Sequence, residues 1–358
     1  MRLKSYIKRL SYCSSRVVFY IMIFTRFPAV ALNYYRYITG GKKIRVSHSP
    51  LLVNFYITNK CNFNCRMCLR KEQGYADSAG MRKDMDLGKF SELLAKFNKC
   101  IYVQFAGLGE PLLNKDIFKM MSLARERRKG IILYTNAAFL DQQAAVRICD
   151  LGVHRVNISL YGANPEEFFA NTGSDRQDYY SVLDNISRLV RIKKSRSPRL
   201  MVSILYICSK RNIDDCLKVI DIGNLLGVDE IHFNNFNHQP FDAEAGKDWY
   251  LFEDDMEVVK TVARMRSYYS YAQVFAPAVL KISAPKKACP SYYKYINIDY
   301  EGNVAGCCKF SYPVKENGNI YSDKDIFNTD HFLKMRSIFT GKHCELPRNC
   351  KLCQEIYK

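Results

Sequence analysis

Two kinds of stretch alternate along the middle of the chain. Short runs of apolar, β-branched and aromatic residues are followed by longer stretches in which apolar residues recur every three or four positions. The first kind predicts β-strands, and the second predicts helices with one buried face. Six such alternations predict an α/β fold with a parallel sheet covered by helices. The expected strands are residues 51–58, 100–105, 131–134, 155–160, 200–207 and 230–234.

Capping residues mark the ends of several expected helices. Asn114 and Asp141 are placed to cap the helices that follow the second and third strands. Gly227 is placed to end a helix over residues 212–226. A further helical pattern covers residues 254–269, within a region that is otherwise hard to assign.

Three cysteines follow the first expected strand at short spacing. Cys61, Cys65 and Cys68 form a C-x3-C-x2-C pattern. Three thiolates are one ligand too few for a closed tetrahedral zinc site or for a cubane held only by protein. They suit a four-iron cluster in which one iron stays open to a small molecule. The alternative is three core cysteines that lie together by chance.

At this motif the chain resembles the radical SAM superfamily, whose members carry this spacing and bind S-adenosylmethionine at the open iron. The resemblance implies a partial (β/α)6 TIM-like barrel with its chemistry at the C-terminal strand ends. It also implies reductive cleavage of the cofactor to a 5′-deoxyadenosyl radical, which abstracts hydrogen from an unactivated carbon. The family usually has an aromatic residue before the third cysteine. Here it is Met67, whose thioether can still pack on a purine.

Three other strand ends carry residues that the resemblance assigns to the cofactor. Gly107, Gly109 and Glu110 follow the second strand in a sequence that resembles the family's Gly-Gly-Glu-Pro motif. Backbone carbonyls of this loop and the Glu110 carboxylate can accept hydrogen bonds from the cofactor's amino group. Asn136 after the third strand and Ser159 at the end of the fourth would touch its ribose or carboxylate. Ordinary turn chemistry is the alternative for both.

A second group of cysteines lies near the C-terminus. Two extended runs flank a turn at residues 301–303 and predict a hairpin that brings Cys289 and Cys307 together. With Cys350 and Cys353 the segment resembles the SPASM/twitch extension of radical SAM enzymes. The resemblance implies that these four cysteines hold an auxiliary 4Fe-4S cluster.

The ligands and the role of this second group have alternatives. Cys308 competes with Cys307, and Cys344 is a candidate replacement. A structural zinc could take the place of the cluster. If an auxiliary cluster accepts an electron from a substrate radical, the net reaction is a two-electron oxidation. A purely structural cluster is the competing interpretation.

Two residues outside these motifs could contribute to chemistry. Cys208 follows the fifth strand, where it could donate a hydrogen atom that quenches a substrate radical. His232 on the sixth strand could line the barrel, although a satisfied core histidine is the simpler interpretation.

Charge and cysteine content limit the partners and the compartment. The chain of 358 residues has a net charge of +19, and residues 1–50 hold ten Lys and Arg but no Asp or Glu. This asymmetry indicates an anionic membrane surface as partner of residues 1–47, with an ordinary packed helix as one alternative and a spanning or cleaved segment as another. Nucleic acid is not expected, because no RNA-binding signature accompanies the charge. Most of the 14 cysteines fall in short-spaced groups, which indicates metal ligation in the reducing cytoplasm.

The sequence therefore predicts a cytoplasmic radical SAM oxidoreductase that acts on a small-molecule, glycan or lipid-linked substrate and receives electrons from a flavodoxin or ferredoxin. The alternatives are a peptide-modifying maturase and a non-catalytic iron–sulfur redox sensor. The expected units are a basic segment at 1–48, the core barrel at 49–238, a linker and helix at 239–288, and the auxiliary domain at 289–358.

Overall fold

The fold was obtained as a computed structural model. It describes residues 27–66, 68, 70, 84–236, 249–281, 289–307, 313–341 and 346–356. The basic stretch before residue 27, Met67 and the two alternative ligands Cys308 and Cys344 lie outside these ranges.

One sheet of ten strands organises the described residues. Its order is β10-β9-β8-β1-β2-β3-β4-β5-β6-β7. Neighbours from β8 through β1 to β7 are parallel, which confirms the predicted parallel sheet. The pairs β8–β9 and β9–β10 are antiparallel. The strands are β1 Leu52–Phe55, β2 Tyr102–Phe105, β3 Gly130–Thr135, β4 Arg155–Ser159, β5 Met201–Cys208, β6 Glu230–Asn235, β7 Gln273–Phe275, β8 Tyr295–Ile298, β9 Asn303–Ala305 and β10 Val314–Asn319.

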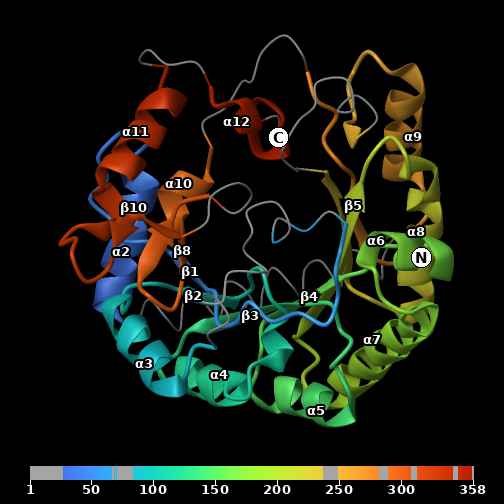
Figure 1. Ribbon diagram of the computed structural model, residues 1–358, viewed down its shortest axis with the longest axis horizontal. Helices are drawn as coiled ribbons and strands as arrows, with labels where there is room; N and C mark the ends of the chain where they lie inside the picture. Colours follow the sequence, from blue (N-terminus) through green and yellow to red (C-terminus); the bar gives the residue numbers. More distant parts are fainter. Residues whose placement is uncertain are drawn as a thin grey trace.

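Helices surround the outer face of the sheet, and the strands curve inside them (Figure 1). The sheet is open, because its order ends at β10 on one side and at β7 on the other. It is therefore a partial barrel, as predicted. The α-helices are α2 Pro28–Thr39, α3 Leu87–Lys96, α4 Ile117–Glu126, α5 Gln142–Asp150, α6 Pro165–Thr172, α7 Arg176–Arg196, α8 Cys216–Leu226, α9 Met256–Ser267, α10 Ser291–Lys294, α11 Asp330–Phe339 and α12 Arg348–Lys351, and short 3-10 helices cover Pro111–Leu113, Ile213–Asp215, Ile326–Asn328 and Gln354–Ile356.

Side-chain alternation divides each strand between the helices and the inside of the curve. Phe55 of β1 packs against Phe90 of α3, with ring centroids 4.9 Å apart. A Cβ on Gly223 of α8 would lie 2.4 Å from Ile231 Cδ1, so α8 rests directly on β6. Because alternate residues of a strand face opposite sides, the residues next to Ile231 face the inside of the sheet. We call this inner side the lumen face.

The lumen face of the central strands is polar. Strand register places residues of one face in continuous rows across the sheet. Several of these residues are buried although they are polar. Such side chains need hydrogen-bond partners in the fold or on a bound molecule. The buried polar residues of the lumen face include Asn54, Gln104, Asn157, Ser203, Glu230 and Asn297.

The C-terminal segment contacts the sheet on both sides of its curve. The predicted hairpin is present as β8 and β9, and β8 also pairs with β1, where Asn54 Nδ2 donates to Asn297 Oδ1 at 2.8 Å. On the other side Gln354 is fully buried against the end of β6. Its Oε1 accepts from Asn235 N at 3.1 Å, and its Nε2 donates to Asn234 Oδ1 at 2.9 Å. The segment predicted as an appended unit is thus part of the same sheet.

The helix ends follow the predictions with one difference. Asp141 caps α5 by accepting from Ala144 N at 2.8 Å, and Gly227 ends α8 with φ 71°. Asn114 does not cap α4, which begins after Asp116. Its side-chain amide instead donates to Ile57 O at 2.7 Å and so links the segment after β2 to the segment after β1. Strand β7 and the separate helix α6 were not predicted.

Helix α2 lies at the N-terminal ends of the first strands. Val30 packs with Leu51 and Ile101, which directly precede β1 and β2. On its other side Tyr35 is 60% exposed and Ile38 is 56% exposed. Within the described ranges, no helix combines the length and the apolar composition that crossing a bilayer requires.

Candidate active site

The loop that carries the three cysteines leaves β1 at its C-terminal end and lies against the end of α6. Asn64 N donates to Thr172 O at 2.8 Å, and Arg66 N donates to Asn171 O at 2.8 Å. These two backbone bonds hold the loop from its outer side. The other side of the loop faces the ends of the neighbouring strands.

Cys61, Cys65 and Cys68 are all half-buried. Cys68 N donates to Cys65 O at 3.1 Å, so the last two cysteines belong to one tight turn. The thiols are therefore neither sealed in the core nor fully open to water. This is an environment in which a cluster could be held while one of its irons stays accessible.

Two glycines allow the loop after β2 to approach the cysteine loop. A Cβ on Gly109 would lie 2.5 Å from Thr58 O and 2.6 Å from Lys60 O. Any side chain there would push the two loops apart. An added Cβ on Gly107 would lie 2.9 Å from the ring of Tyr56. Gly109 thus allows close contact between two backbones, and Gly107 allows close contact with the Tyr56 ring.

Glu110 joins the loops after β1, β2 and β3. Its N–H donates to Lys60 O at 2.8 Å, and its carboxylate accepts from Leu112 N at 3.0 Å, Thr135 Oγ1 at 2.7 Å and Asn136 N at 2.7 Å. Burial raises the pKa of Glu110 to about 7, although these three donors act to lower it. The carboxylate predicted to receive the cofactor's amino group is thus already bound by three donors of the chain.

Asn136 connects the turn after β3 to the cysteine loop. Its Nδ2 lies 3.9 Å from Cys61 Sγ and donates to Asn62 Oδ1 at 2.8 Å. Its Oδ1 accepts from Ala138 N at 2.9 Å, which fixes the side chain in the turn. Hydrogen bonds to ligand sulfurs tune the potential of iron–sulfur clusters. The side chain predicted to touch the cofactor therefore already contacts the first predicted cluster ligand.

Ser159 at the end of β4 forms a hydrogen bond with the phenol of Tyr161. Burial is the main cause that raises the pKa of Tyr161, and the nearby Cys65, Cys68 and Cys61 add to it, while a hydrogen bond with Ser159 lowers it. The phenol therefore lies between Ser159 and the cysteines. The ends of β1, β2, β3 and β4 thus converge on one place, as the sequence predicts.

Cys208 lies in a different environment from the one expected. It is fully buried, and its Sγ is 3.3 Å from Sγ of Cys216 at the start of α8. The thiol therefore faces the helix layer and not the lumen. This placement argues against a role for Cys208 as hydrogen donor to a substrate radical.

The four predicted auxiliary ligands come from three segments of the C-terminal region. Cys289 precedes α10, Cys307 follows β9, and Cys350 with Cys353 lies at α12. Burial, followed by the nearby Cys289, raises the pKa of Cys350 to about 12. The first and third segments therefore bring thiols close together.

Across the described positions, no three or more His, Cys, Asp or Glu side chains group closely enough to hold one metal ion. The thiolates of a four-iron cluster bind different irons, so they stand further apart than the ligands of a single ion.

Residues 55–223 match the model of the Radical SAM superfamily. This stretch, a little under half of the chain, is a radical SAM domain. Such a domain implies a 4Fe-4S cluster and S-adenosylmethionine. The matched residues include the cysteine loop, the glycine loop and the ends of β3 and β4.

Curated relatives share part of the radical SAM domain. A protein of Metallosphaera sedula named probable GTP 3′,8-cyclase is 25% identical over 58% of this chain and 62% of its own length. A protein of the same name from Methanocaldococcus jannaschii is 30% identical over 49% of this chain and 56% of its own length. The chain thus spans little more than half the length of the curated relatives it matches.

Solved structures of similar fold cover more of the chain. Streptococcus suis SuiB bound to the precursor peptide SuiA has a TM-score of 0.62 at 14% identity, over 91% of this chain and 74% of that one. The enzyme anSMEcpe with AdoMet and a peptide bound has a TM-score of 0.61 at 16% identity, over 86% and 88% of the two chains. At these identities the likeness concerns the radical SAM fold.

The residues at the rim fit the group that the family requires. Cys61, Cys65 and Cys68 would hold a cluster with one open iron. The amide of Asn136 lies against one of these sulfurs. The backbone contact at Gly109 leaves no room for a side chain between the two loops. When bound, the cluster and S-adenosylmethionine supply the reducing electron and the radical.

Proposed function

We propose that the protein is a radical SAM oxidoreductase that cleaves S-adenosylmethionine reductively and oxidises a polar small-molecule, glycan or lipid-linked substrate. The observation that carries the proposal is the convergence of four strand ends on the cysteine loop. Glu110 holds three of these ends together through Lys60, Thr135 and Asn136. A non-catalytic sensor would not need this arrangement around an open iron.

The polar lumen supports the choice of a polar substrate. Buried amides and hydroxyls line it. Asn54 Nδ2 donates to Asn297, but Asn54 Oδ1 accepts no hydrogen bond from any residue that the structure describes. A purely apolar substrate would leave such groups without partners, which costs free energy for each. Hydroxyl-rich molecules could satisfy them.

The auxiliary cluster is the part of the proposal that concerns oxidation. Cys289, Cys307, Cys350 and Cys353 would be its ligands. Gln354, next to the last of them, contacts the lumen-facing Asn234 at 2.9 Å. A cluster at this place would stand beside the end of β6, close enough to the lumen to accept an electron from a substrate. A flavodoxin or ferredoxin would supply the electron that starts the reaction.

Peptide modification is the alternative substrate class. The two solved structures named above hold bound peptides, and the curated relatives are named for GTP. A substrate panel should therefore contain cyclic polyols, nucleotide sugars, GTP and peptides.

The test of the proposal uses the full chain, purified without oxygen and reconstituted with iron and sulfide. We expect about eight irons per chain, for two four-iron clusters, and 5′-deoxyadenosine after reduction with S-adenosylmethionine. The variant with Cys61, Cys65 and Cys68 all changed to Ala should keep about four irons and form no 5′-deoxyadenosine. Cys149→Ala is the matched control, because this thiol is buried in α5.

Two outcomes contradict parts of the proposal. Iron that is lost completely in the triple variant would refute the auxiliary cluster. A fully loaded chain that forms no 5′-deoxyadenosine would refute the enzyme and favour the redox sensor.

The basic N-terminus extends the proposal to location. We propose that the protein is cytoplasmic and that residues 1–47 contact an anionic membrane surface. Deleting residues 2–26 leaves α2 and its packing on Leu51 and Ile101 in place. The deletion removes six of the ten basic residues of this segment and should weaken flotation with liposomes that contain phosphatidylserine. Unchanged flotation would contradict the membrane contact.

A further inference from the structure

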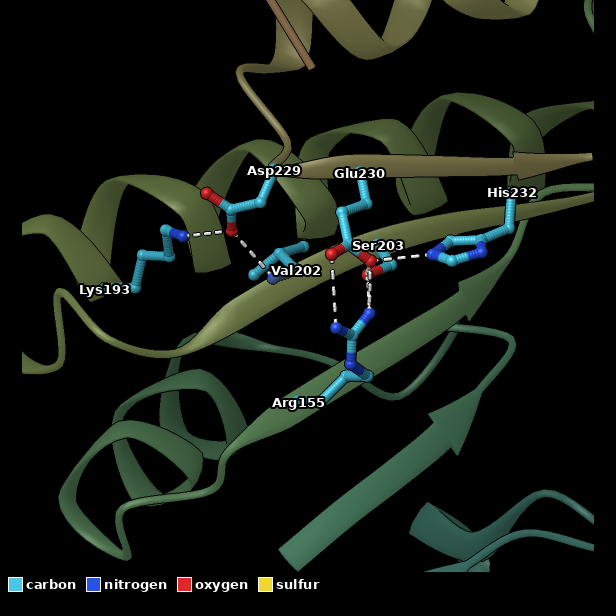
Figure 2. Close-up of polar contacts among 7 residues, drawn as sticks. All are labelled: Arg155, Lys193, Val202, Ser203, Asp229, Glu230 and His232. Carbon is cyan, nitrogen blue, oxygen red and sulfur yellow. Dashed lines mark hydrogen bonds and ion pairs between the residues drawn. The ribbon is translucent and has the colours of Figure 1, made fainter. Parts of the chain in front are cut away.

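A charged group lies on the lumen face away from the cysteine loop (Figure 2). Glu230, at the start of β6, has a side chain that is only 4% exposed. Arg155 of β4 binds both of its oxygens: Nη1 contacts Oε2, and Nη2 donates to Oε1 at 3.2 Å. Ser203 Oγ of β5 adds a contact to Oε2 at 3.3 Å. Three strands thus fix one carboxylate.

This carboxylate holds a histidine in place. His232 Nε2 lies 2.7 Å from Glu230 Oε2. The imidazole stacks on Phe275 of β7, with centroids 4.3 Å apart and planes 10° apart. Its side chain is 28% exposed, and Nδ1 has no hydrogen-bond partner within the described part of the chain. The ring is therefore oriented on one side and open on the other.

The charges around the ring set its tautomer. Burial alone would raise the pKa of Glu230, but hydrogen bonds from His232 and Arg155 lower it to about 2. The ionised carboxylate can only accept, so Nε2 carries the hydrogen and Nδ1 keeps its lone pair.

The groups around the ring come from its own strand and three others. Glu230 of β6 and Phe275 of β7 contact the ring, and Ser203 of β5 and Arg155 of β4 contact Glu230. Lys193 and Asp229 form a separate buried pair that also binds Val202 N, beside this group in Figure 2. That pair links α7 to the start of β5.

Strand register relates this histidine to the rim. Ser159 pairs with Leu205, and Leu205 pairs with His232. The three side chains therefore form one row across β4, β5 and β6. Two strand spacings separate its ends, about 10 Å. A small substrate placed beside the rim would reach from Ser159 to His232.

We propose that His232, held by Glu230 and Arg155, is the proton acceptor for a hydroxyl or amino group of the substrate. The inference rests on the proposed function. Hydrogen abstraction from the carbon that bears the hydroxyl leaves a carbon radical. As that radical loses its O–H proton to Nδ1 it gives up one electron, for which an oxidised auxiliary iron–sulfur cluster held by Cys289, Cys307, Cys350 and Cys353 would be the acceptor. A carbonyl forms, and 5′-deoxyadenosine carries the abstracted hydrogen. For an amine the same balance gives an imine.

The site therefore selects a class of substrate. A hydroxyl or amino group must stand next to the carbon that is attacked, because the proton must leave from that atom. The ring of Phe275 offers an apolar surface beside the base, on which the carbon skeleton could rest. Cyclic polyols and amino sugars have this combination, whereas a bare hydrocarbon does not.

The first test reads the tautomer directly and needs neither substrate nor turnover. The full chain, with oxidised clusters and ¹⁵N-labelled histidine, is examined by long-range ¹H–¹⁵N correlation at pH 7.5. We expect His232 to be neutral with the hydrogen on Nε2, and the signals are assigned by their loss in His232→Gln. His331→Gln is the control for assignment. A doubly protonated ring, or a hydrogen on Nδ1, overturns the proposal.

The second test measures how available Nδ1 is. Diethyl pyrocarbonate modifies neutral imidazole nitrogens, and mass spectrometry gives the rate at each histidine, with His331 as internal reference. His232 should react, and Glu230→Gln should slow its reaction about tenfold, because the ionised carboxylate keeps the hydrogen on Nε2 and the lone pair on Nδ1. Glu257→Gln, which changes an exposed carboxylate of α9 paired with Lys260, is the control and should leave the rate unchanged.

The outcomes separate this inference from the proposed function. If His232 stays unmodified while His331 reacts, the proposal that His232 is the proton acceptor is refuted. It is also refuted if Glu230→Gln leaves the rate at His232 unchanged. Formation of 5′-deoxyadenosine by the same preparation would show that the radical enzyme stands without it. If Glu230→Gln does not fold, the tautomer of the unaltered chain still decides.

Discussion

Glu110 gives the clearest prediction of a pH effect, because its environment differs from water in a defined direction. The side chain is 2% exposed, and burial raises its pKa from 4.5 to about 7. Below 4.5 the carboxyl is protonated in both the folded and the unfolded chain. Between the two values the unfolded chain loses the proton while the folded chain keeps it. The stability contributed by Glu110 is therefore present below pH 4.5 and is lost as the pH rises through 7.

The difference between the two pKa values corresponds to about 3.4 kcal/mol at 1.36 kcal/mol per pH unit, as an upper bound. Glu110→Gln removes the titration and keeps the size. The amide of Gln places an N–H donor opposite the Asn136 N–H, where the carboxylate oxygen accepted a hydrogen bond. This donor–donor mismatch costs about 1–3 kcal/mol. The variant should therefore be less stable than the parent at pH 5, and the difference should shrink or reverse by pH 8.

The assay is equilibrium urea unfolding of the cluster-free chain at pH 5, 6, 7 and 8, with reductant and without oxygen. Only the difference between parent and variant is interpreted, since other groups titrate in both. Two profiles that stay parallel from pH 5 to 8 would show that Glu110 does not carry the raised pKa. Thr135→Val is the matched control, because it removes one donor to the same carboxylate without removing the titrating group.

Three further predictions concern close contacts. Gly109→Ala should weaken S-adenosylmethionine binding by at least tenfold in isothermal titration, about 1.4 kcal/mol, whereas Gly88→Ala near the start of α3 should not. Arg336 is fully buried, so Arg336→Ala should lower the free energy of unfolding by about 3–5 kcal/mol, and Arg336→Met by less; equal losses in urea unfolding would contradict this. Asn297→Leu leaves the amide of Asn54 without its partner and should cost about 1–3 kcal/mol. Adding Asn54→Leu should recover part of that loss, and strict additivity of the two changes would rule out coupling.

Local pattern explains what the sequence could predict. Each strand and helix of the core is defined by a short periodic stretch, and the cysteine, glycine and asparagine motifs stand directly at strand ends. Because parallel strands end on the same side, the motifs had to converge. The pairing of β8 with β1 joins residues more than 200 positions apart. Local periodicity holds no information on such pairing, so the sequence indicated an appended unit instead.

Cys208 was misplaced although a signal was available. It shares its face of β5 with Ile204 and Tyr206, both fully buried, so alternation along the strand assigns it to the helix layer. The strand-end position alone suggested the rim. The same alternation places Glu230 and His232 together on the lumen face. Their contact with Arg155 could not be predicted, because it depends on the register of three strands.

The positions of α2 and of the cysteine loop bear on the substrate. Asn33 of α2 binds Ser49 and Lys99 O, which precede β1 and β2. The cysteine loop leaves β1 at the opposite end. If residues 1–47 contact a membrane as proposed, that surface adjoins the N-terminal ends of the strands, and the radical site faces away from it. A substrate anchored in the same membrane would then have to reach around the sheet. Membrane contact through α2 therefore favours a soluble polyol or amino sugar over a lipid-linked substrate.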